Sequence, residues 1–255
     1  MADKKDVAKN ETSGEVSPQP PAGGMIDSFL SQAKQLGPAA EGGERARLVF
    51  ALDATMSRQP TWDLACRLQG EMFETAAGIG EMFETAAGIG GLAVQLVYFR
   101  GFDECRSSRW VVQPRALTDL MSQIGCRGGH TQIRRVLRHV KNEAQANPLK
   151  AFIYVGDAME EPIDDLCAAA GELGLLGIKA FMFHEGADPI AAQAFQEIAR
   201  LTGGAYARFD ASAPHSLAGL LRAAAAYASG GASALARLAA RESEAQKLLT
   251  AMGKH

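Results

Sequence analysis

Short apolar runs alternate with helical segments over most of the chain. The runs predict strands at about 47–53, 92–99, 108–113, 151–156, 178–183 and 205–209. Between them, apolar residues recur every three or four positions, which predicts helices at about 61–88, 115–124, 131–146, 162–175, 189–202 and 215–229. Strands that alternate with helices are typical of a parallel sheet covered on both faces. We therefore expect an α/β fold with a doubly wound, mostly parallel sheet of six strands flanked by helices.

The two ends of the chain have a different pattern. Residues 1–24 are polar and rich in Lys, Glu, Ser, Pro and Gly, a composition that predicts disorder. A short amphipathic helix is predicted at 25–36, followed by a linker to residue 46; this helix either packs on the domain or docks a partner. The folded domain is expected at 47–229. Residues 230–255 carry an apolar stripe that predicts one C-terminal helix, at about 231–252.

One segment of the chain is duplicated. EMFETAAGIG occurs at 71–80 and again, without a mismatch, at 81–90. Natural repeats have longer periods, so we interpret the duplication as a recent or engineered tandem copy. Ten residues advance an α-helix by roughly 1000°, about 80° short of three turns, so both copies cannot keep one face inward. One copy is expected to be surplus.

Composition and charge limit the classes of function. The chain is 47% hydrophobic and 22% charged, as in soluble globular proteins. A net charge of -3 indicates no basic surface for nucleic acid, and no apolar run is long enough to span a membrane. The four cysteines form no CxxC pair, so neither a zinc knuckle nor a disulfide framework is indicated. The N-terminus lacks the apolar segment of a secretory signal, so the cytoplasm is the expected compartment.

Oxygen-bearing side chains occur where several loops are expected to meet. In an open parallel sheet, ligands bind beyond the carboxyl ends of the strands. Two predicted strands end in a carboxylate, and hydroxyl side chains lie in loops at the same edge. Hard oxygen ligands with only two acids and no imidazole suit Mg²⁺ or Mn²⁺ that keeps part of its own water. The expected metal ligands are Asp53, Thr55, Ser57, Thr131 and Asp157.

Three sequence elements in this order resemble a known family. They are D-x-T-x-S after the first strand, Gly-Gly-x-Thr before a helix, and a strand-terminal Gly-Asp. The pattern is similar to the metal-ion-dependent adhesion site of von Willebrand factor A domains. The resemblance implies a Rossmann-like fold, contacts from Thr55, Ser57 and Thr131 to the metal, and contacts through water from Asp53 and Asp157. It also implies a coordination position that a partner's carboxylate fills, and therefore a metal-dependent protein-binding module.

Two positions depart from the family pattern. Thr55 replaces the commoner Ser and keeps the hydroxyl, whereas Met56 stands where a small residue is frequent. The Met56 side chain either shields the ion or contacts the partner. The residues expected to form a partner-binding rim around the metal are Met56, His130, Glu160 and Glu161.

The rim residues also have simpler interpretations. His130 and Cys126 have no second partner at zinc spacing, so His130 is expected to be an exposed loop residue rather than a zinc ligand. The acidic run after Asp157 is also typical of solvated helix N-termini that offset the helix dipole.

Two other interpretations of the site remain open. Asp and Ser after a strand also serve as simple turn caps. Haloacid-dehalogenase-type phosphotransferases share a strand-terminal D-x-[DT]-x-[TS] and a later Gly-Asp. In such an enzyme Asp53 would be the nucleophile, Asp157 a metal ligand and Lys150 a phosphate clamp. Against this, Thr131 follows a glycine turn and opens a helix, and no cap insertion follows residue 57. We therefore expect a binding module and not an enzyme.

Overall fold

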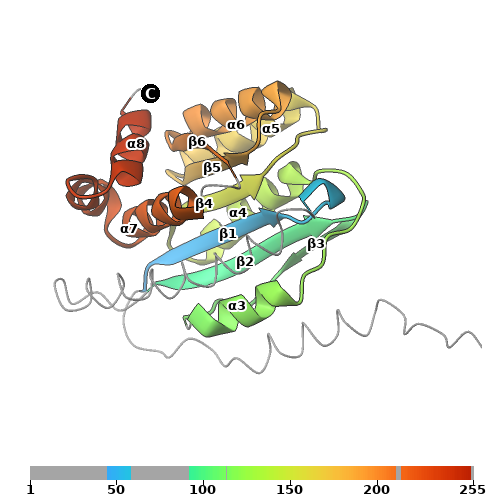
Figure 1. Cartoon of the computed structure of the whole chain (residues 1–255), viewed down its shortest axis with the longest axis horizontal. Helices are drawn as coiled ribbons and strands as arrows, with labels where there is room; N and C mark the ends of the chain where they lie inside the picture. The colour runs from blue at the N-terminus through green and yellow to red at the C-terminus, as the bar shows by residue number, and fades with distance from the viewer. Residues whose placement is uncertain (1–44, 59–91, 113, 211–213, 254–255) are drawn as a thin grey trace, which may run out of the picture.

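A computed structural model describes residues 45–58, 92–112, 114–210 and 214–253. Within these residues a sheet of six strands has the order β3-β2-β1-β4-β5-β6 (Figure 1). Five strands are parallel, and β3 runs antiparallel to β2 at one edge. The strands are β1 (Arg47–Asp53), β2 (Ala93–Arg100), β3 (Glu104–Ser107), β4 (Leu149–Gly156), β5 (Lys179–Glu185) and β6 (Ala205–Phe209). The predicted α/β fold with a mostly parallel sheet is confirmed.

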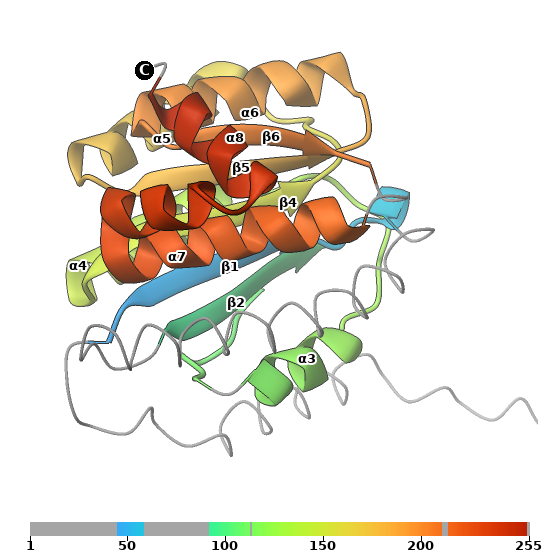
Figure 2. The same ribbon diagram turned by 60° about the vertical axis from the view of Figure 1, so that its left-hand side comes forward.

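Helices cover both faces of the sheet (Figure 2). One face carries α3 (Pro114–Ser122), α7 (Pro214–Ala239) and α8 (Ser243–Met252); the other carries α4 (Ile133–Ala146), α5 (Ile163–Leu175) and α6 (Pro189–Thr202). Alternate residues of a strand point to opposite faces. In β1, Phe50 enters the first core and Val49 and Ala51 enter the second. Because both faces are buried, such a strand is an unbroken apolar run in the sequence.

Local signals determine where α6 begins and ends. The carboxylate of Asp188 accepts hydrogen bonds from the backbone N–H groups of Ile190, at 2.8 Å, and Ala191, at 3.3 Å. Pro189 follows in the first turn of the helix. Backbone N–H groups there have no acceptor within the helix, so the missing N–H of proline costs no hydrogen bond. Gly203 ends the helix in the left-handed region, with a φ of 60°. The predicted helix at 189–202 is confirmed.

The predicted strand at 108–113 is wrong. Gly101, with a φ of 61°, allows the chain to reverse directly after β2, and β3 forms earlier, at Glu104–Ser107. Residues after β3 contact β2 through a bridge between Val94 and Val111, a bond from the Ser108 N–H to the Leu96 carbonyl, and a bond from the Leu96 N–H to the Ser108 hydroxyl. The apolar run around Val111 indicated a strand, whereas the real edge strand is mostly polar and lacks that signal.

The single helix predicted at 231–252 is divided in the structure. α7 continues to Ala239 and contains a non-helical residue, Gly231, with φ 66° and ψ -160°. α8 then begins at Ser243, after Glu242 in an extended conformation. The Glu242 carboxylate accepts hydrogen bonds from the Arg222 guanidinium of α7 at 3.1 and 3.2 Å, which fixes the turn between the two segments.

Other predictions lie outside the described residues. They are most of the N-terminal tail at 1–46 with its helix at 25–36, the helix at 61–88, and the duplicated segments at 71–90. None of the described helices is both long and apolar enough to cross a membrane.

Candidate metal centre

The predicted ligands lie at the edge of the sheet where the parallel strands end. A short 3₁₀ turn, η1 (Met56–Arg58), follows β1 and is visible as the blue turn at the end of that strand (Figure 1). Because β1 lies between β2 and β4, the loop after β1 is flanked by the loops that follow both neighbours. This placement agrees with the general location of ligand sites in open parallel sheets.

Asp53 is the last residue of β1 and is fully buried. Its Oδ1 accepts a hydrogen bond from the backbone N–H of Thr55 at 2.8 Å, whereas its Oδ2 has no hydrogen-bond partner among the described residues. Burial raises the pKa of Asp53 from 3.8 to about 6, because the charged carboxylate loses its water. Hydrogen bonding to Thr55 and the positive charge of Arg58 lower that pKa, and the negative charge of Asp157 raises it further.

The hydroxyls of Thr55 and Ser57 lie together above β1. Their oxygen atoms are 3.1 Å apart; Thr55 is buried and Ser57 is exposed. The turn is closed by the Arg58 N–H, which donates to the Thr55 carbonyl at 3.1 Å. The end of β1 and the η1 turn that follows it therefore bring these two hydroxyls together just beyond Asp53.

The loop before α4 packs against the loop after β2. The Arg127 N–H donates to the Ala54 carbonyl at 3.1 Å, and the His130 N–H donates to the Gly101 carbonyl at 3.3 Å. Gly129 has to be glycine, because a Cβ there would lie 2.0 Å from the Gly101 carbonyl oxygen. This close approach holds the loop that leads to Thr131 against the loop after β2.

Thr131 is tied to the segment that follows Asp157. Its N–H donates to Glu160 Oε2 at 3.0 Å, and its hydroxyl accepts from the Glu160 N–H at 3.0 Å. The neighbouring carboxylate of Glu161 accepts from the backbone N–H groups of Ile133 and Arg134, the first residues of α4. Glu161 therefore caps α4, whose N-terminal dipole favours a negative charge. Of the two predicted rim acids, Glu160 is the exposed one.

Asp157 follows β4 and is half-buried. Its Oδ1 is buried without a hydrogen-bond partner among the described residues, as is Oδ2 of Asp53. The hydroxyl of Tyr154, on β4 three residues before Asp157, is also buried and lacks a partner among the described residues. Burial raises the pKa of Tyr154 well above its usual value, and the charges of Asp53 and Asp157 raise it further. These polar atoms therefore share one poorly hydrated region.

The residues of this region fit a hard divalent cation. Buried carboxylate oxygens are normally paired with a donor or a metal, and two of them are unpaired on adjacent strands. The remaining expected ligands are hydroxyl oxygens, which suit Mg²⁺ or Mn²⁺ rather than zinc. In the part of the chain that the structure describes, no three His, Cys, Asp and Glu side chains lie close enough together to hold a metal ion, so hydroxyl oxygens would have to complete the ligand set. His130 and Cys126 accordingly form no such cluster.

Three residues near the centre were not found from the sequence. Arg58, whose side chain is 1% exposed, forms an ion pair with Glu185 at 2.9 Å. Phe102, which is 69% exposed, packs its ring edge-on against His130 with centroids 5.1 Å apart. Arg58 directly follows the D-x-T-x-S motif, but an arginine after a motif gives no sign that it is buried. For the surface formed by Phe102 and His130, the only sequence signal was an apolar residue, Phe102, shortly after the end of a predicted strand.

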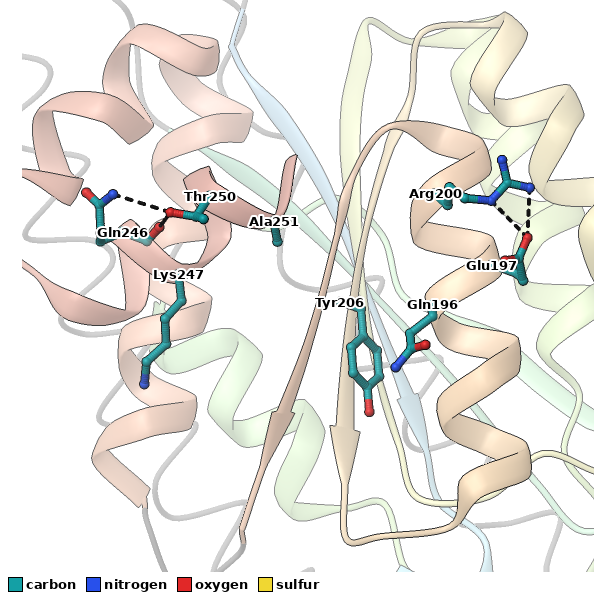
Figure 3. A pocket seen from close by; sticks show the side chains of 8 residues that line it. All are labelled: Gln196, Glu197, Arg200, Tyr206, Gln246, Lys247, Thr250 and Ala251. Atoms are coloured by element: carbon teal, nitrogen blue, oxygen red, sulfur yellow. Dashed lines mark hydrogen bonds and ion pairs between the residues drawn. The ribbon is translucent and has the colours of Figure 1, made fainter. Parts of the chain in front are cut away.

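A pocket of about 710 Å³ lies between α6, β6 and α8 (Figure 3). Tyr206 forms part of it, and the Tyr206 hydroxyl lies 2.9 Å from Nδ1 of His184. The predicted metal ligands do not line this pocket, so it is separate from the candidate centre. Its lining residues are Gln196, Glu197, Arg200, Tyr206, Gln246, Lys247, Thr250 and Ala251.

Comparison with known proteins identifies the fold. No family model matches the sequence, and no curated protein is similar to it. A von Willebrand factor type A structure from Catenulispora acidiphila is similar, with a TM-score of 0.56 and 17% identity over 72% of this chain and 43% of that chain. The SpRpn10 VWA domain is similar with a TM-score of 0.51 and 8% identity, over 68% of this chain and 95% of that chain. The fold is that of von Willebrand factor A domains.

Another structure with the von Willebrand factor A fold is similar over nearly its whole length. The vWF domain of the pili tip protein Mfa5 from Porphyromonas gingivalis has a TM-score of 0.50 and 11% identity, over 71% of this chain and 96% of that chain. The chain thus spans less than half of the Catenulispora structure but almost all of the two smaller domains. At these identities the likeness extends to the fold alone. The haloacid-dehalogenase alternative is not favoured, since Thr131 precedes α4 and does not end a strand.

Proposed function

We propose that this chain is a protein-binding module that uses Mg²⁺ or Mn²⁺ to hold an acidic side chain of a partner protein. One observation carries the proposal: the buried oxygens Asp53 Oδ2 and Asp157 Oδ1 have no hydrogen-bond partner among the described residues. Leaving buried acceptors unpaired is costly. A divalent cation held by Asp53 and Asp157 would remove that cost. Von Willebrand factor A folds that serve protein interactions are consistent with this proposal.

The expected ligands include both charged and neutral oxygen atoms. When bound, the ion supplies a concentrated positive charge and an exchangeable coordination position for a carboxylate. Asp53 and Asp157 balance that charge, and Thr55, Ser57 and Thr131 supply neutral oxygens. Because the protein contributes only two carboxylates, a third one from a partner meets no excess of negative charge.

The surface around the centre has an apolar component for the partner. Met56 on η1 is 52% exposed, so its side chain is available at the rim. Phe102 and His130 form the neighbouring aromatic pair. Exposed aromatic and methionine side chains are enriched at protein interfaces. The rim that we propose for a partner is therefore Met56, Phe102 and His130, with Glu160 beside His130 at 3.2 Å.

A thermal unfolding experiment tests the metal centre. A ligand that binds only the folded state stabilises it by about 2.7 kcal/mol at a concentration of 100 Kd. One kcal/mol shifts Tm by roughly 2–4 °C in a domain of this size. Addition of ~10 mM Mg²⁺ to chelated protein, with a Kd on the order of 0.1 mM, should therefore raise Tm by roughly 5–10 °C.

Two variants make this test specific. Asp53→Ala should abolish the rise in Tm, whereas Asp119→Ala, at an exposed position of α3, should keep it. A wild-type shift below about 1 °C with Mg²⁺ and Mn²⁺ alike would contradict the metal centre. Partner capture should then depend on Mg²⁺ and be lost with EDTA. Hydrolysis of an aryl phosphate that depends on Asp53 would instead support the phosphotransferase.

A further inference from the structure

Arg58 is a buried cation at the end of the proposed metal-binding loop. It is the last residue of η1, and its N–H closes the turn that carries Thr55 and Ser57. Its side chain is 1% exposed, and its Nη2 lies 2.9 Å from Oε2 of Glu185, whose side chain is 9% exposed. A fully buried guanidinium is rare unless it is paired, so this contact is a specific feature of the loop.

Glu185 is held firmly from both sides. It is the last residue of β5 and pairs with Phe209 in β6. Gly186 follows with a φ of 90°, and its N–H donates to the Phe209 carbonyl at 3.3 Å. Asp188 then caps α6. The backbone that carries the Glu185 carboxylate is thus fixed by a sheet ladder before it and a helix after it.

The ion pair spans the strand that carries Asp157. In the sheet, β4 lies between β1 and β5. Arg58 comes from the loop after β1 and Glu185 from the end of β5, so their contact crosses the carboxyl end of β4. Adjacent strands are about 4.8 Å apart, which the combined length of an arginine and a glutamate can bridge. The pair therefore joins the loop after β1 to the end of β5, across the end of β4.

We infer that Arg58 and Glu185 are positioning residues, which hold the loop at 54–58 in its metal-binding conformation before the ion arrives. The inference rests on the proposed function, because it assumes that hydroxyls of this loop contact the metal. A buried ion pair is weak support for stability but can specify one conformation. Residues that orient metal ligands from outside are commonly needed for full metal affinity.

Two variants separate positioning from simple charge effects. Glu185→Gln removes a negative charge near the centre and also breaks the ion pair with Arg58. The double variant Arg58→Met/Glu185→Met removes one charge of each sign, so the net charge is unchanged while the link is lost. If charge alone acts, only the first variant weakens Mg²⁺ binding; if the link positions the loop, both do.

The test measures Mg²⁺ and Mn²⁺ affinity of the full chain by calorimetry, well below Tm. Both variants should bind roughly tenfold or more weakly, the loss typical for residues that orient metal ligands. Glu242→Gln, which breaks the Arg222 pair between α7 and α8, is the matched control and should leave the affinity unchanged. Arg58→Lys keeps the positive charge and most of the aliphatic side chain, so it should lose less metal affinity. It replaces any of the other variants that fails to fold.

A second measurement needs no metal. Hydrogen exchange of the Thr55 and Arg58 amides in the chelated protein should be faster in both variants than in wild type, because the η1 turn is no longer held. Unchanged affinity in both variants, with a lower Tm, would assign the pair a merely structural role and overturn the inference. Failure of wild type to bind either ion would overturn the proposed function itself, and the positioning role with it.

Discussion

Single buried polar atoms define the chemistry at the end of β1. Burial raises the pKa of Asp53 to about 6, against the opposing hydrogen bonds from Thr55. The nearby Tyr154 hydroxyl is buried without a partner among the described residues. Such groups are uncommon in folded proteins and are often found at functional sites. The unpaired carboxylate oxygen of Asp53 and the unpaired hydroxyl of Tyr154 are therefore expected to lower the free energy of unfolding.

Removal of the Tyr154 hydroxyl tests this local cost. Tyr154→Phe should leave the free energy of unfolding unchanged or raise it by about 1 kcal/mol, since an unpaired buried hydroxyl is removed and the ring stays in place. The comparison variant is Tyr98→Phe, because the part-buried Tyr98 hydroxyl donates to Glu104 Oε1 at 2.9 Å. That variant should lose about 1–2 kcal/mol. Urea unfolding of both measures the difference, and an equal loss in the two variants would contradict it.

Elements at the strand ends are joined by close backbone contacts. The loop before α4 lies directly on the loop after β2, through Gly129 and the Gly101 carbonyl. Glu161, which comes after β4, caps α4 from 27 and 28 residues away. The position of Thr131 therefore depends on three elements that are distant in sequence.

Alanine substitutions at neighbouring glycines test this packing. Gly129→Ala places a Cβ 2.0 Å from a backbone oxygen, and relief of the clash must move one loop. Overpacking of this kind costs about 1–3 kcal/mol, so Tm should fall by roughly 2–12 °C, and Mg²⁺ binding should weaken as Thr131 moves. Gly128→Ala meets nothing within 4 Å and should change neither quantity by much. Equal Tm values for the two variants would show that the contact is not restrictive.

The whole molecule presents different surfaces at its two sheet edges. Phe102 and Met56 are exposed at the edge where β1 and β2 end. Leu175, at the end of α5, is exposed at the opposite edge, because α5 runs back from the end of β4 to the start of β5. If a partner binds at the candidate centre, only the first of these apolar surfaces should matter.

A pair of truncations tests that asymmetry. Phe102→Ala should weaken binding of a partner captured in an EDTA-sensitive manner by roughly fivefold or more, the effect of losing an interface residue that contributes over 1 kcal/mol. Leu175→Ala removes a side chain that is 91% exposed and should leave binding unchanged. Titration of the partner against each purified variant gives the two affinities. A larger loss with Leu175→Ala would place the interface at the other edge.

The sequence by itself determined the layers of the fold and the main features of the candidate centre. Apolar runs and helical periodicity are local properties, so β1, α6 and β6 were predicted within a residue of their bounds. Asp53 ends such a run and Thr55 and Ser57 follow at alternate positions, which indicated a shared site, although the η1 turn and not strand alternation brings Ser57 to Thr55. The sequence thus predicted that five oxygen-bearing side chains gather at one sheet edge, and their binding of a metal stays a prediction.

Tertiary structure alone decided the contacts between distant residues. Buried Arg58 forms an ion pair with Glu185 of β5, and the capping role of Glu161 depends on where α4 begins. The location of β3 depends on the turn at Gly101, since a mostly polar edge strand has no continuous apolar run to mark it. Local sequence patterns reflect interactions between residues a few positions apart. The features above arise instead from the order of the strands in the sheet, which brings together residues that are far apart in the sequence.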